Sequence, residues 1–506
     1  RDAAWRDVLL WDEHTWGADR SISEPDSPQT LAQWHFKQRF ALDADSASRA
    51  LLARAAHGGA TGRGVDLWNT HAVVRHGVTI IPDSLSRGGD RVRDAAGRAV
   101  ASQRLQDGAL AVRLDLQPMG ATRIMIARDG GERDARVPGD APVRAAGDSL
   151  WNGRVVVHVD PRSGAIASVR WRGRELVDQA KGGWDRYRYV LGRDTSRAQD
   201  ASHTRIDVLD LGPLVATLRV TSDAPGAVSP LVRDVTLHAG SDAIQLVVHL
   251  DKAAVRAKEA VHIGFPLAVG GGTVRMEQGW AVVRPDLDQA DGANRNLYPV
   301  QRWLDASNEE FGVTVVTPDL PLWELNGLTA EAFEQADGRE EWLTHSLPGT
   351  ELVAYAMNNY WHTNFKADQS GPVMFRVVLV PHGAFNAADA THAALEVSEP
   401  PVVARAAASA VKGPLFELDD TSVVVSSVAP SADAMAVMVR LWNPTDRAAR
   451  VGFTWRRGRA PRVWMSSPTG EHRVLVHGRI EVPAMGSVTV RVEGGGERRP
   501  ACRLTS

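Results

Sequence analysis

The chain contains one cysteine among its 506 residues, Cys502. An internal disulfide therefore cannot form, and a thiol so close to the end of the sequence is better interpreted as incidental than as catalytic. No apolar run of about eighteen residues occurs, so no transmembrane helix is expected. The 58 Lys and Arg side chains against 61 Asp and Glu give a formal net charge of -3, which leaves no overall field to attract nucleic acid or a membrane surface.

The sequence also lacks an initiator methionine, because it begins with Arg1. A targeting segment therefore cannot be judged, and the compartment stays open, with a cytoplasmic location favoured by the missing disulfide and membrane span. What the chain does have is length and apolar content. At roughly 150 residues per domain its length predicts about three domains, and 43% apolar residues are ample for their cores.

Only the first part of the chain carries a helical pattern. From Gln29 to Ala56 apolar residues stand among good helix formers, and Pro28 is placed to open a helix. The pattern predicts one or two helices, built on Leu31, Trp34, Phe36, Phe40, Leu42, Leu51 and Leu52. Glycines at positions 58, 59, 62 and 64 then end the pattern and mark a hinge or boundary.

Beyond residue 64 the pattern predicts a mainly β protein. Short β-branched runs end at Gly, Pro, Asp or Asn without intervening amphipathic helices, which favours stacked antiparallel sheets. The clearest runs are Val155–Val159, Leu214–Val220, Ile244–Leu250, Val373–Val380 and Met438–Trp442. We expect a helical segment over 1–60, a small β-sandwich over 65–128, a linker over 129–147, a large two-sheet sandwich over 148–395, a last sandwich over 411–494 and a disordered polar tail over 495–506.

The densest group of polar and aromatic side chains near the start of the chain lies between Trp11 and Trp16 and contains Asp12, Glu13 and His14. Such a group suits sugars, because indole faces stack on pyranose rings, carboxylates accept hydroxyl hydrogen bonds and a neutral imidazole can hold a metal ion. The alternative is a helix end whose Trp and His side chains complete the core. Both interpretations stay open on composition alone.

This stretch resembles a known family. Leu9 to Ile22, LLWDEHTWGADRSI, resembles the segment of glycoside hydrolase family 38 α-mannosidases in which a histidine supplies one ligand of the catalytic zinc. Further segments, spread in the same order over nearly the whole chain, resemble the part of large bacterial members that follows the catalytic domain. They are GRAVASQ (97–103), QPMG (117–120), DPRSGAI (160–166), KEAVHIGFP (258–266), QRW (301–303), NNYWHTNF (358–365) and RLWNP (440–444).

The resemblance implies a fold, a cofactor and a partner. The helical segment would be the end of the family's middle helical domain, followed by a small β-sandwich, a large galactose-mutarotase-like β supersandwich and a C-terminal β-sandwich. His14 would be one zinc ligand, with Thr15 and Trp16 as substrate contacts. The other zinc ligands, the nucleophile and the acid/base carboxylate would lie in an N-terminal α/β domain.

That domain is not visible in the sequence. Only thirteen residues precede His14, too few for βαβ units of about thirty residues each. We therefore expect the chain to be the C-terminal portion of a longer enzyme, with no activity in isolation.

Two details of the first motif bear on its chemistry. A retaining glycosidase needs two carboxyl groups about 5 to 5.5 Å apart, and the adjacent Asp12 and Glu13 point in different directions on a helix or a strand, so they are not assigned as this pair. Either could orient the imidazole of His14 through its second nitrogen, or lie on the surface of a helix end. Thr15 stands where many family members have an aspartate that contacts mannose, which puts the identity of the sugar in question.

A second candidate substrate surface is the run NNYWHTN, residues 358–364, which lies between two predicted strands. Asn amides and a His ring can bind hydroxyls while an aromatic ring stacks, so Asn358, Trp361, His362 and Asn364 are candidate substrate contacts. Alternatively, the Asn side chains satisfy their own turn and the aromatic rings fill the end of the sandwich.

A third candidate is the run RPDLDQADGANRN, residues 284–296, in which Asp288 and Arg295 could line a cleft. Its Gly and Asn content also fits an ordinary long hairpin loop. The spacing of Asp286, Asp288 and Asp291 lacks the Gly and the distal Glu of a calcium loop, so calcium is not favoured.

Three classes of function stay open, and a carbohydrate is the expected ligand. The first is a retaining, zinc-dependent α-mannosidase-like hydrolase acting on α-mannosides or glycans. The second is a carbohydrate-binding or scaffolding β module without chemistry of its own. The third, from the fold alone, is a sugar epimerase or polysaccharide lyase. A lyase would use Tyr, His and Arg side chains, and its candidate tyrosines are Tyr298, Tyr355 and Tyr360.

Overall fold

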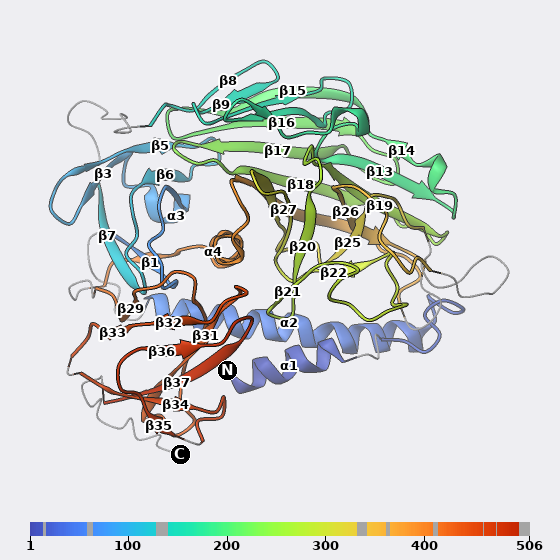
Figure 1. Cartoon of the computed structure of the whole chain (residues 1–506). Helices are drawn as coiled ribbons and strands as arrows, with labels where there is room; N and C mark the ends of the chain where they lie inside the picture. Colours follow the sequence, from blue (N-terminus) through green and yellow to red (C-terminus); the bar gives the residue numbers. More distant parts are fainter. Residues whose placement is uncertain are drawn as a thin grey trace.

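The computed structural model describes residues 1–13, 17–57, 64–127, 140–330, 342–360, 365–407, 413–458, 460–471 and 473–494. The expected tail over 495–506 lies outside these ranges, and the expected linker is described only from residue 140. Within them the protein is mainly β, as predicted (Figure 1). The α-helices of this part are α1 (Asp2–Asp12), α2 (Pro28–His57), α3 (Asp83–Ser86) and α4 (Ala387–Ser398), with short 3-10 turns at Gln179–Lys181 and Thr195–Arg197. None of these helices combines the length and the apolar character that crossing a bilayer requires.

Helices α1 and α2 form a hairpin that lies beneath the large sandwich (Figure 1). The prediction of a helix opened by Pro28 is confirmed, and the segment is one helix of 30 residues. Its start is capped by Ser27, whose hydroxyl oxygen accepts a hydrogen bond from the Thr30 backbone N–H at 3.2 Å. A serine before a first-turn proline satisfies a backbone donor that would otherwise lack a partner.

The small sandwich has two sheets that enclose a core of Val, Leu and Ile side chains. Its first sheet takes one strand from far along the chain, because β28 pairs antiparallel with β1. The order of this sheet is β28 (Val402–Arg405), β1 (Val65–Asn69), β7 (Gly120–Ala127), β3 (Arg91–Asp94) and β4 (Ala99–Val100). The second sheet has the order β2 (Val78–Ile81), β6 (Leu110–Arg113) and β5 (Ser102–Arg104).

The large sandwich contains three antiparallel sheets that share one core. The nine-stranded sheet has the order β15 (Ser202–Leu211), β16 (Val215–Asp223), β17 (Leu231–His238), β18 (Ile244–Lys252), β27 (Gly371–His382), β24 (Gly312–Val316), β23 (Trp303–Ser307), β20 (Thr273–Gln278) and β21 (Ala281–Val283). The six-stranded sheet has the order β14 (Gln199–Asp200), β13 (Arg186–Leu191), β19 (Glu259–Pro266), β26 (Glu351–Asn358), β25 (Leu322–Leu325) and β22 (Tyr298–Pro299). The five-stranded sheet has the order β12 (Arg174–Glu175), β11 (Ile166–Trp171), β10 (Val155–Val159), β9 (Ser149–Trp151) and β8 (Arg144–Ala146).

The strands expected in this sandwich are confirmed as β10, β16, β18 and β27. β10 alternates buried and exposed residues, which is the period of two that a sheet with one wet face produces. In β19, by contrast, all eight residues are buried. A strand without an exposed side chain is covered on both faces, so β19 lies in the interior of the protein.

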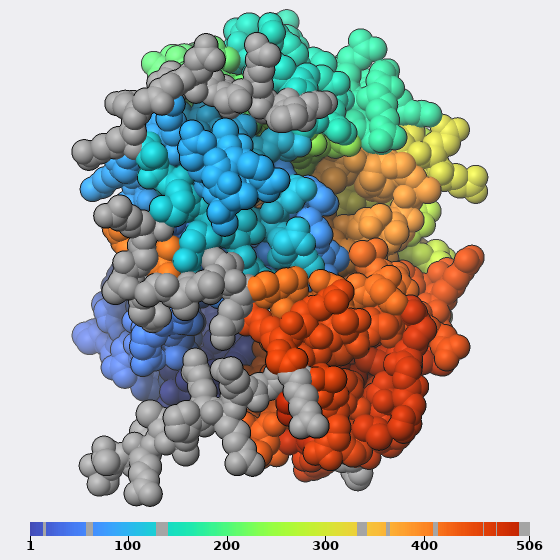
Figure 2. Space-filling view, turned by 90° about the vertical axis from the view of Figure 1, so that its left-hand side faces the viewer, coloured from blue at the N-terminus to red at the C-terminus, as the bar shows by residue number. Residues whose placement is uncertain are grey.

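The C-terminal sandwich lies below the small sandwich on the side of the molecule shown in Figure 2. Its main sheet includes the strand predicted at Met438–Trp442. The order of that sheet is β30 (Val424–Pro430), β31 (Ala436–Trp442), β37 (Ser487–Glu493), β34 (Arg462–Ser466) and β35 (Val474–Leu475). The paired strands β29 (Phe416–Leu418) with β33 (Phe453–Trp455) and β32 (Ala449–Val451) with β36 (Ile480–Val482) complete its core.

Helix α4, which the sequence analysis did not anticipate, lies in the centre of the molecule (Figure 1). Asn386 caps its start, since its side-chain oxygen accepts from the backbone N–H of Ala388 at 2.9 Å. Arg75 from the small sandwich donates to the carbonyl oxygen of Glu399 at 2.6 Å, just beyond the other end of α4. Leu395 of α4 packs with Trp442 of the C-terminal sandwich. The helix therefore joins the sandwiches to one another.

Candidate functional site

A junction between the helical hairpin and the large sandwich brings together two segments that the sequence analysis singled out. The hydroxyl of Ser21, a buried residue in the turn between α1 and α2, donates a hydrogen bond to the carbonyl oxygen of Phe365. Ser21 lies near the end of the segment Leu9 to Ile22, and Phe365 ends the segment NNYWHTNF. Two stretches more than 340 residues apart in sequence thus meet at their flanking residues.

An ion-pair clamp fastens the same junction. The guanidinium of Arg256, in the loop between β18 and β19, donates to both carboxylate oxygens of Asp26 at 2.7 and 2.6 Å, and to Asp368 at 3.3 Å. These hydrogen bonds raise the pKa of Arg256 and lower the pKa of Asp26. The ammonium of Lys366 also lies over the Trp34 ring, 6.0 Å from its centroid. The clamp joins the hairpin turn to both loops of the sandwich that border the site.

On the hairpin side, the end of α1 is held by a buried lysine. The Lys37 ammonium donates to the carbonyl oxygen of Leu10 at 2.8 Å and to the carboxylate of Glu13 at 3.0 Å. A cation at the C-terminal end of a helix satisfies free carbonyls and complements the helix dipole. Gly17 follows with φ of +134°, and a Cβ there would lie 3.1 Å from the Trp34 ring. The chain is thus fixed on both sides of residues 14–16.

On the sandwich side, Asn359 fixes the end of β26. Its side-chain amide donates to the carbonyl oxygens of Val255, Ala257 and Ala367 at 3.0, 3.1 and 2.7 Å. One buried side chain therefore ties the end of β26 to the β18–β19 loop and to the segment that leads into β27. This arrangement matches the alternative in which an Asn of this run satisfies local backbone, and for Asn359 the role is structural.

A buried ion pair supports this end of the strand from below. The Lys252 ammonium and the Glu259 carboxylate are 2.6 Å apart and both almost fully buried. Tyr189 donates its hydroxyl hydrogen bond to the other oxygen of Glu259 at 2.6 Å, and burial together with this contact raises the pKa of Tyr189. The backbone N–H of Asn359 donates to the carbonyl of Glu259 at 2.8 Å. The loop after β26 therefore starts from a rigid base.

A second buried polar pair lies on the same sheet. The Nδ1 atom of His262 is 2.7 Å from a carboxylate oxygen of Glu324, and the imidazole lies 5.0 Å from the Tyr355 ring, centroid to centroid. Asn358 pairs with Ala260 on this stretch of β19 and β26. Its Oδ1 atom is buried without a hydrogen-bond partner in the part of the chain that the structure describes. Of the candidate contacts in the run 358–364, Asn358 is the one within this part.

The remaining candidates of the two motifs lie outside the described residues. They are the expected zinc ligand His14 and the expected substrate contacts Thr15, Trp16, Trp361, His362 and Asn364. Their assignments stay predictions. What the structure adds is the placement of the residues on either side of them.

The third candidate run, residues 284–296, is held by contacts within its own region. Asp288 accepts both side-chain hydrogen bonds of Arg284, at 2.9 and 2.8 Å, and these lower its pKa. Arg295 is almost fully buried and donates to Asp286 at 2.9 Å and to the carbonyl of Ala290 at 3.0 Å. Both charges have partners inside the run, which is the arrangement of a self-supporting hairpin loop.

The tyrosines that a lyase would need are engaged elsewhere. Tyr298, Tyr355 and Tyr360 are all buried, and their hydroxyls bond to the Ser346 side chain, the Ala330 carbonyl and the Gly192 carbonyl. Burial raises the pKa of Tyr298. A proton-abstracting tyrosine needs access to substrate and a lowered pKa, so these three are structural in the present arrangement.

The described residues do not form a metal centre by themselves. No group of three or more His, Cys, Asp or Glu side chains within these ranges is placed to hold an ion. A stable zinc site uses three or four ligands. The candidate ligand His14 would therefore need partners from outside the part of the chain that the structure covers.

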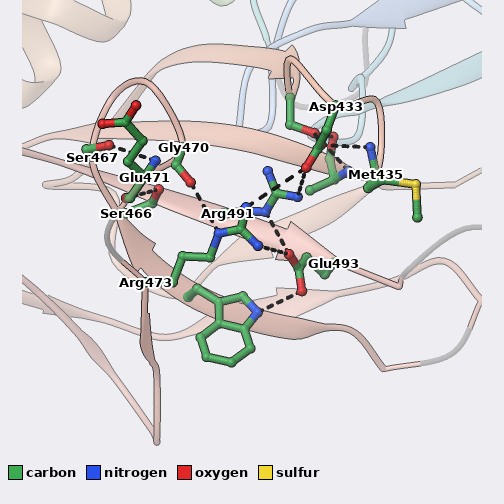
Figure 3. A network of polar contacts seen from close by, with 12 residues as sticks. Asp433, Met435, Ser466, Ser467, Gly470, Glu471, Arg473, Arg491 and Glu493 are labelled. Carbon is green, nitrogen blue, oxygen red and sulfur yellow. Dashed lines mark hydrogen bonds and ion pairs between the residues drawn. The ribbon is translucent and has the colours of Figure 1, made fainter.

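The C-terminal sandwich carries a polar network of a different kind (Figure 3). Arg491 donates to Asp433 and to Glu493, each at 2.7 Å. Glu493 also accepts from Arg473 at 3.0 Å and from the Trp464 indole at 3.1 Å. The hydrogen bonds from Arg491 hold the pKa values of Asp433 and Glu493 below their ordinary range. The charges pair with one another, so the network ties β37, β34 and their loops together.

Several residues of the junction were not foreseen from the sequence. Ser21, Lys37 and Arg256 act through partners in distant segments or on another helix. The spacing of residues within a short segment cannot predict contacts with a distant segment. Asn359 lies in the run 358–364, which stands out in the sequence, but the predicted substrate contacts are other residues of that run.

The fold is shared with α-mannosidases of known structure. The crystal structure of an alpha-mannosidase from Enterococcus faecalis V583 superposes with a TM-score of 0.67 at 14% identity, over 97% of this chain and 63% of that chain. A protein in glycosyl hydrolase family 38 from Enterococcus faecalis superposes with a TM-score of 0.66 at 14% identity, over 97% of this chain and 66% of that one. The chain therefore has the fold of a part of these proteins and spans less than two thirds of their length.

The sequence comparisons add nothing to this likeness. No family model matches the chain, and no curated protein matches it in sequence. At 14% identity the structural likeness shows a common fold. A common fold does not determine the chemistry, which depends on the residues of the site.

Proposed function

We propose that this chain is the C-terminal portion of a retaining, zinc-dependent α-mannosidase-like glycoside hydrolase that acts on α-mannosides. Its nucleophile and its acid/base carboxylate lie in an N-terminal domain of the same protein. The observation that carries the proposal is the junction at Ser21 and Phe365, which joins the flanks of the two motifs resembling family 38. The likeness in fold over 97% of the chain supports it.

In this proposal each motif has a role. His14 is one zinc ligand, and Thr15 and Trp16 contact the sugar beside it. Trp361, His362 and Asn364, with Asn358, contribute hydroxyl and ring contacts from the sandwich. Bound zinc would supply a positive charge that grips vicinal hydroxyl oxygens of the sugar.

The residues around the motifs position them. Lys37 holds Glu13, the residue before the zinc ligand, on the end of α1. Asn359 and the Lys252–Glu259 pair hold the start of the second segment. Such support is what a site needs to keep its contacts within a fraction of an ångström. Asp288 and Arg295 stay candidate sugar contacts, and each would have to combine that role with its partners in its own loop.

The experiment that tests the proposal compares the full-length protein with the 506-residue chain on an aryl α-mannoside. The full-length protein is expected to hydrolyse it, to lose activity with a chelator and to regain it with zinc. The 506-residue chain alone is expected to be inactive. Zinc-dependent turnover by this chain alone would contradict the proposal, and a full-length protein that binds mannosides without hydrolysing them would favour a carbohydrate-binding module.

Metal analysis gives the matching test for His14. His14→Ala in the full-length protein should lose most of its bound zinc, since a site of three or four ligands is strongly weakened by removing one. His35→Ala, on the exposed side of α2, is the control and should keep its zinc. Equal zinc content in both variants would remove His14 from the site.

A further inference from the structure

Helix α2 buries small and polar side chains and exposes large apolar ones. The residues that it buries most fully are Thr30, Lys37 and Ala44, at 2%, 6% and 7% exposure. They are spaced seven residues apart, about two turns, and so form one stripe. The large apolar residues are on the outside, with Phe36 at 59% and Leu42 at 57% exposure. A surface helix normally shows the opposite arrangement.

The exposed apolar residues are not confined to one side of α2. Leu31 and Leu42 are eleven residues apart and point in nearly the same direction, whereas Phe36 points about 140° away from Leu31 at 100° per residue. A helix that is apolar on several sides is buried among several neighbours. The hairpin and the sandwich supply only some of these neighbours.

Helix α1 also exposes large apolar side chains. Its Trp5 and Leu9 are 63% and 67% exposed, while Ala4 is the residue that it buries within the described structure. Between α1 and α2 lies a groove of about 710 Å³, lined by side chains of both helices and the turn after α1: Leu10, Glu13, Gly17, Gln29, Ala32, Gln33, Phe36, Lys37 and Phe40. Exposed large apolar side chains on the helices that border such a groove indicate an interaction site.

We propose that the outer surface of the α1–α2 hairpin, formed by Trp5, Leu9, Leu31, Phe36 and Leu42 with the groove between the helices, is the docking surface for the N-terminal domain of the same protein. Naming that domain as the occupant rests on the proposed function. The surface itself rests on the burial pattern alone.

Two observations favour this occupant over a second copy of the chain. The α-mannosidases that share the fold are longer, and the rest of their chains has no counterpart here. The surface also continues directly into Glu13 and Gly17, which line the groove and border residues 14–16. A domain seated on the hairpin would therefore contact Glu13 and Gly17, the described residues on either side of 14–16 in the chain.

Side-chain footprinting with a small reactive probe tests the docking surface. In the full-length protein, and after correction for the intrinsic reactivity of each residue type, Phe36, Leu42 and Trp5 should be labelled severalfold more slowly than Leu211, an equally exposed apolar residue on β15 that serves as internal reference. In the 506-residue chain all four should be labelled readily. The comparison with Leu211 inside the full-length protein stands even if the shorter chain does not fold alone.

A pair of variants adds a second measurement. Phe36→Asp with Leu42→Asp should lower the Tm of the full-length protein, and Leu211→Asp should leave it unchanged. Labelling of Phe36 and Leu42 as fast as Leu211, protection that depends on protein concentration as a second copy would require, or a gene that encodes no chain before Arg1 would each overturn the proposal. Footprinting does not depend on turnover, so a protected surface in a protein that hydrolyses no mannoside would refute the function and keep the docking surface.

Discussion

The helical hairpin and the large sandwich differ in which side chains they bury. In the sandwich, three sheets share one core and a strand such as β19 has no exposed residue. In the hairpin, the stripe turned inward holds Thr30, Lys37 and Ala44, while Phe36 and Leu42 face outward. The sandwich thus encloses its apolar side chains, whereas the hairpin leaves several of its largest ones exposed.

The two regions also hold charge differently. Beneath the candidate site the sandwich encloses the Lys252–Glu259 pair away from water. The hairpin is clamped by Arg256 with Asp26, two side chains that are more than half exposed. Solvent weakens the second pair and leaves the first intact. The difference teaches that buried charges hold the sandwich together internally, whereas solvent-exposed charges hold the hairpin against it.

The largest effect should come from breaking the enclosed pair. Lys252→Met leaves the carboxylate of Glu259 buried with only the Tyr189 hydroxyl as partner, and loss of one member of a buried pair costs about 3 to 5 kcal/mol. Arg256→Met, its counterpart at the exposed clamp, should leave the free energy of unfolding nearly unchanged, because solvent screens this pair. Urea denaturation, with hydrogen exchange of the β19 amides as a second measurement, gives the change in the free energy of unfolding for each variant. Equal losses of stability for the two variants would contradict the difference between the buried pair of the sandwich and the exposed pair of the hairpin.

Apolar truncation should separate the regions in the same direction. Leu246→Ala, in the core of the sandwich on β18, should destabilise by about 2 to 5 kcal/mol through lost burial and the cavity left behind. Leu42→Ala in the 506-residue chain should stay within about 0.5 kcal/mol, because its side chain already meets water. The midpoint of urea denaturation decides. A costly Leu42→Ala in this chain would mean that the hairpin surface is already buried.

The C-terminal sandwich should respond to acid. The pKa values of Asp433 and Glu493 are lowered by Arg491 in the folded state, so their contribution is complete above the unfolded values near 4 and is lost as pH falls through the folded values. The Tm of this sandwich should drop below about pH 4. Arg491→Met should flatten that dependence. A wild-type Tm that is independent of pH between about 5 and 3 would show that these charges do not stabilise the fold.

Much of the architecture follows from the sequence, because the strands of the large sandwich obey a local period of two. The runs at Val155–Val159 and Ile244–Leu250 could be placed within a few residues for this reason. The helix from Pro28 was likewise announced by its own residues. Helix α4 was missed, although Asn386 and the alanines after it form a capped start of good helix formers.

The candidate site was only partly predictable. Motifs at 14–16 and 358–364 stand out by composition, yet nothing local indicates that their flanks touch. The contact is made by residues far apart in sequence. Ser21 of the hairpin turn bonds to Phe365, and Arg256 of the sandwich bonds to Asp26 of the same turn. Asn359 shows that residue type alone can also mislead. An asparagine suits a substrate contact, but here its side chain binds three backbone carbonyl oxygens and anchors the loop.

The measurement that tests the central claim most directly compares kcat/KM and Tm for His362→Ala and Asn359→Ala in the full-length protein. His362 is proposed to contact the substrate, whereas Asn359 anchors the backbone at the end of β26. His362→Ala should lower kcat/KM by about threefold to a hundredfold, the range of a lost hydrogen bond worth about 0.5 to 3 kcal/mol, with Tm nearly unchanged. Asn359→Ala should lower Tm by several degrees. A His362→Ala protein that loses Tm and keeps its kcat/KM would contradict the assignment of this loop to the active site.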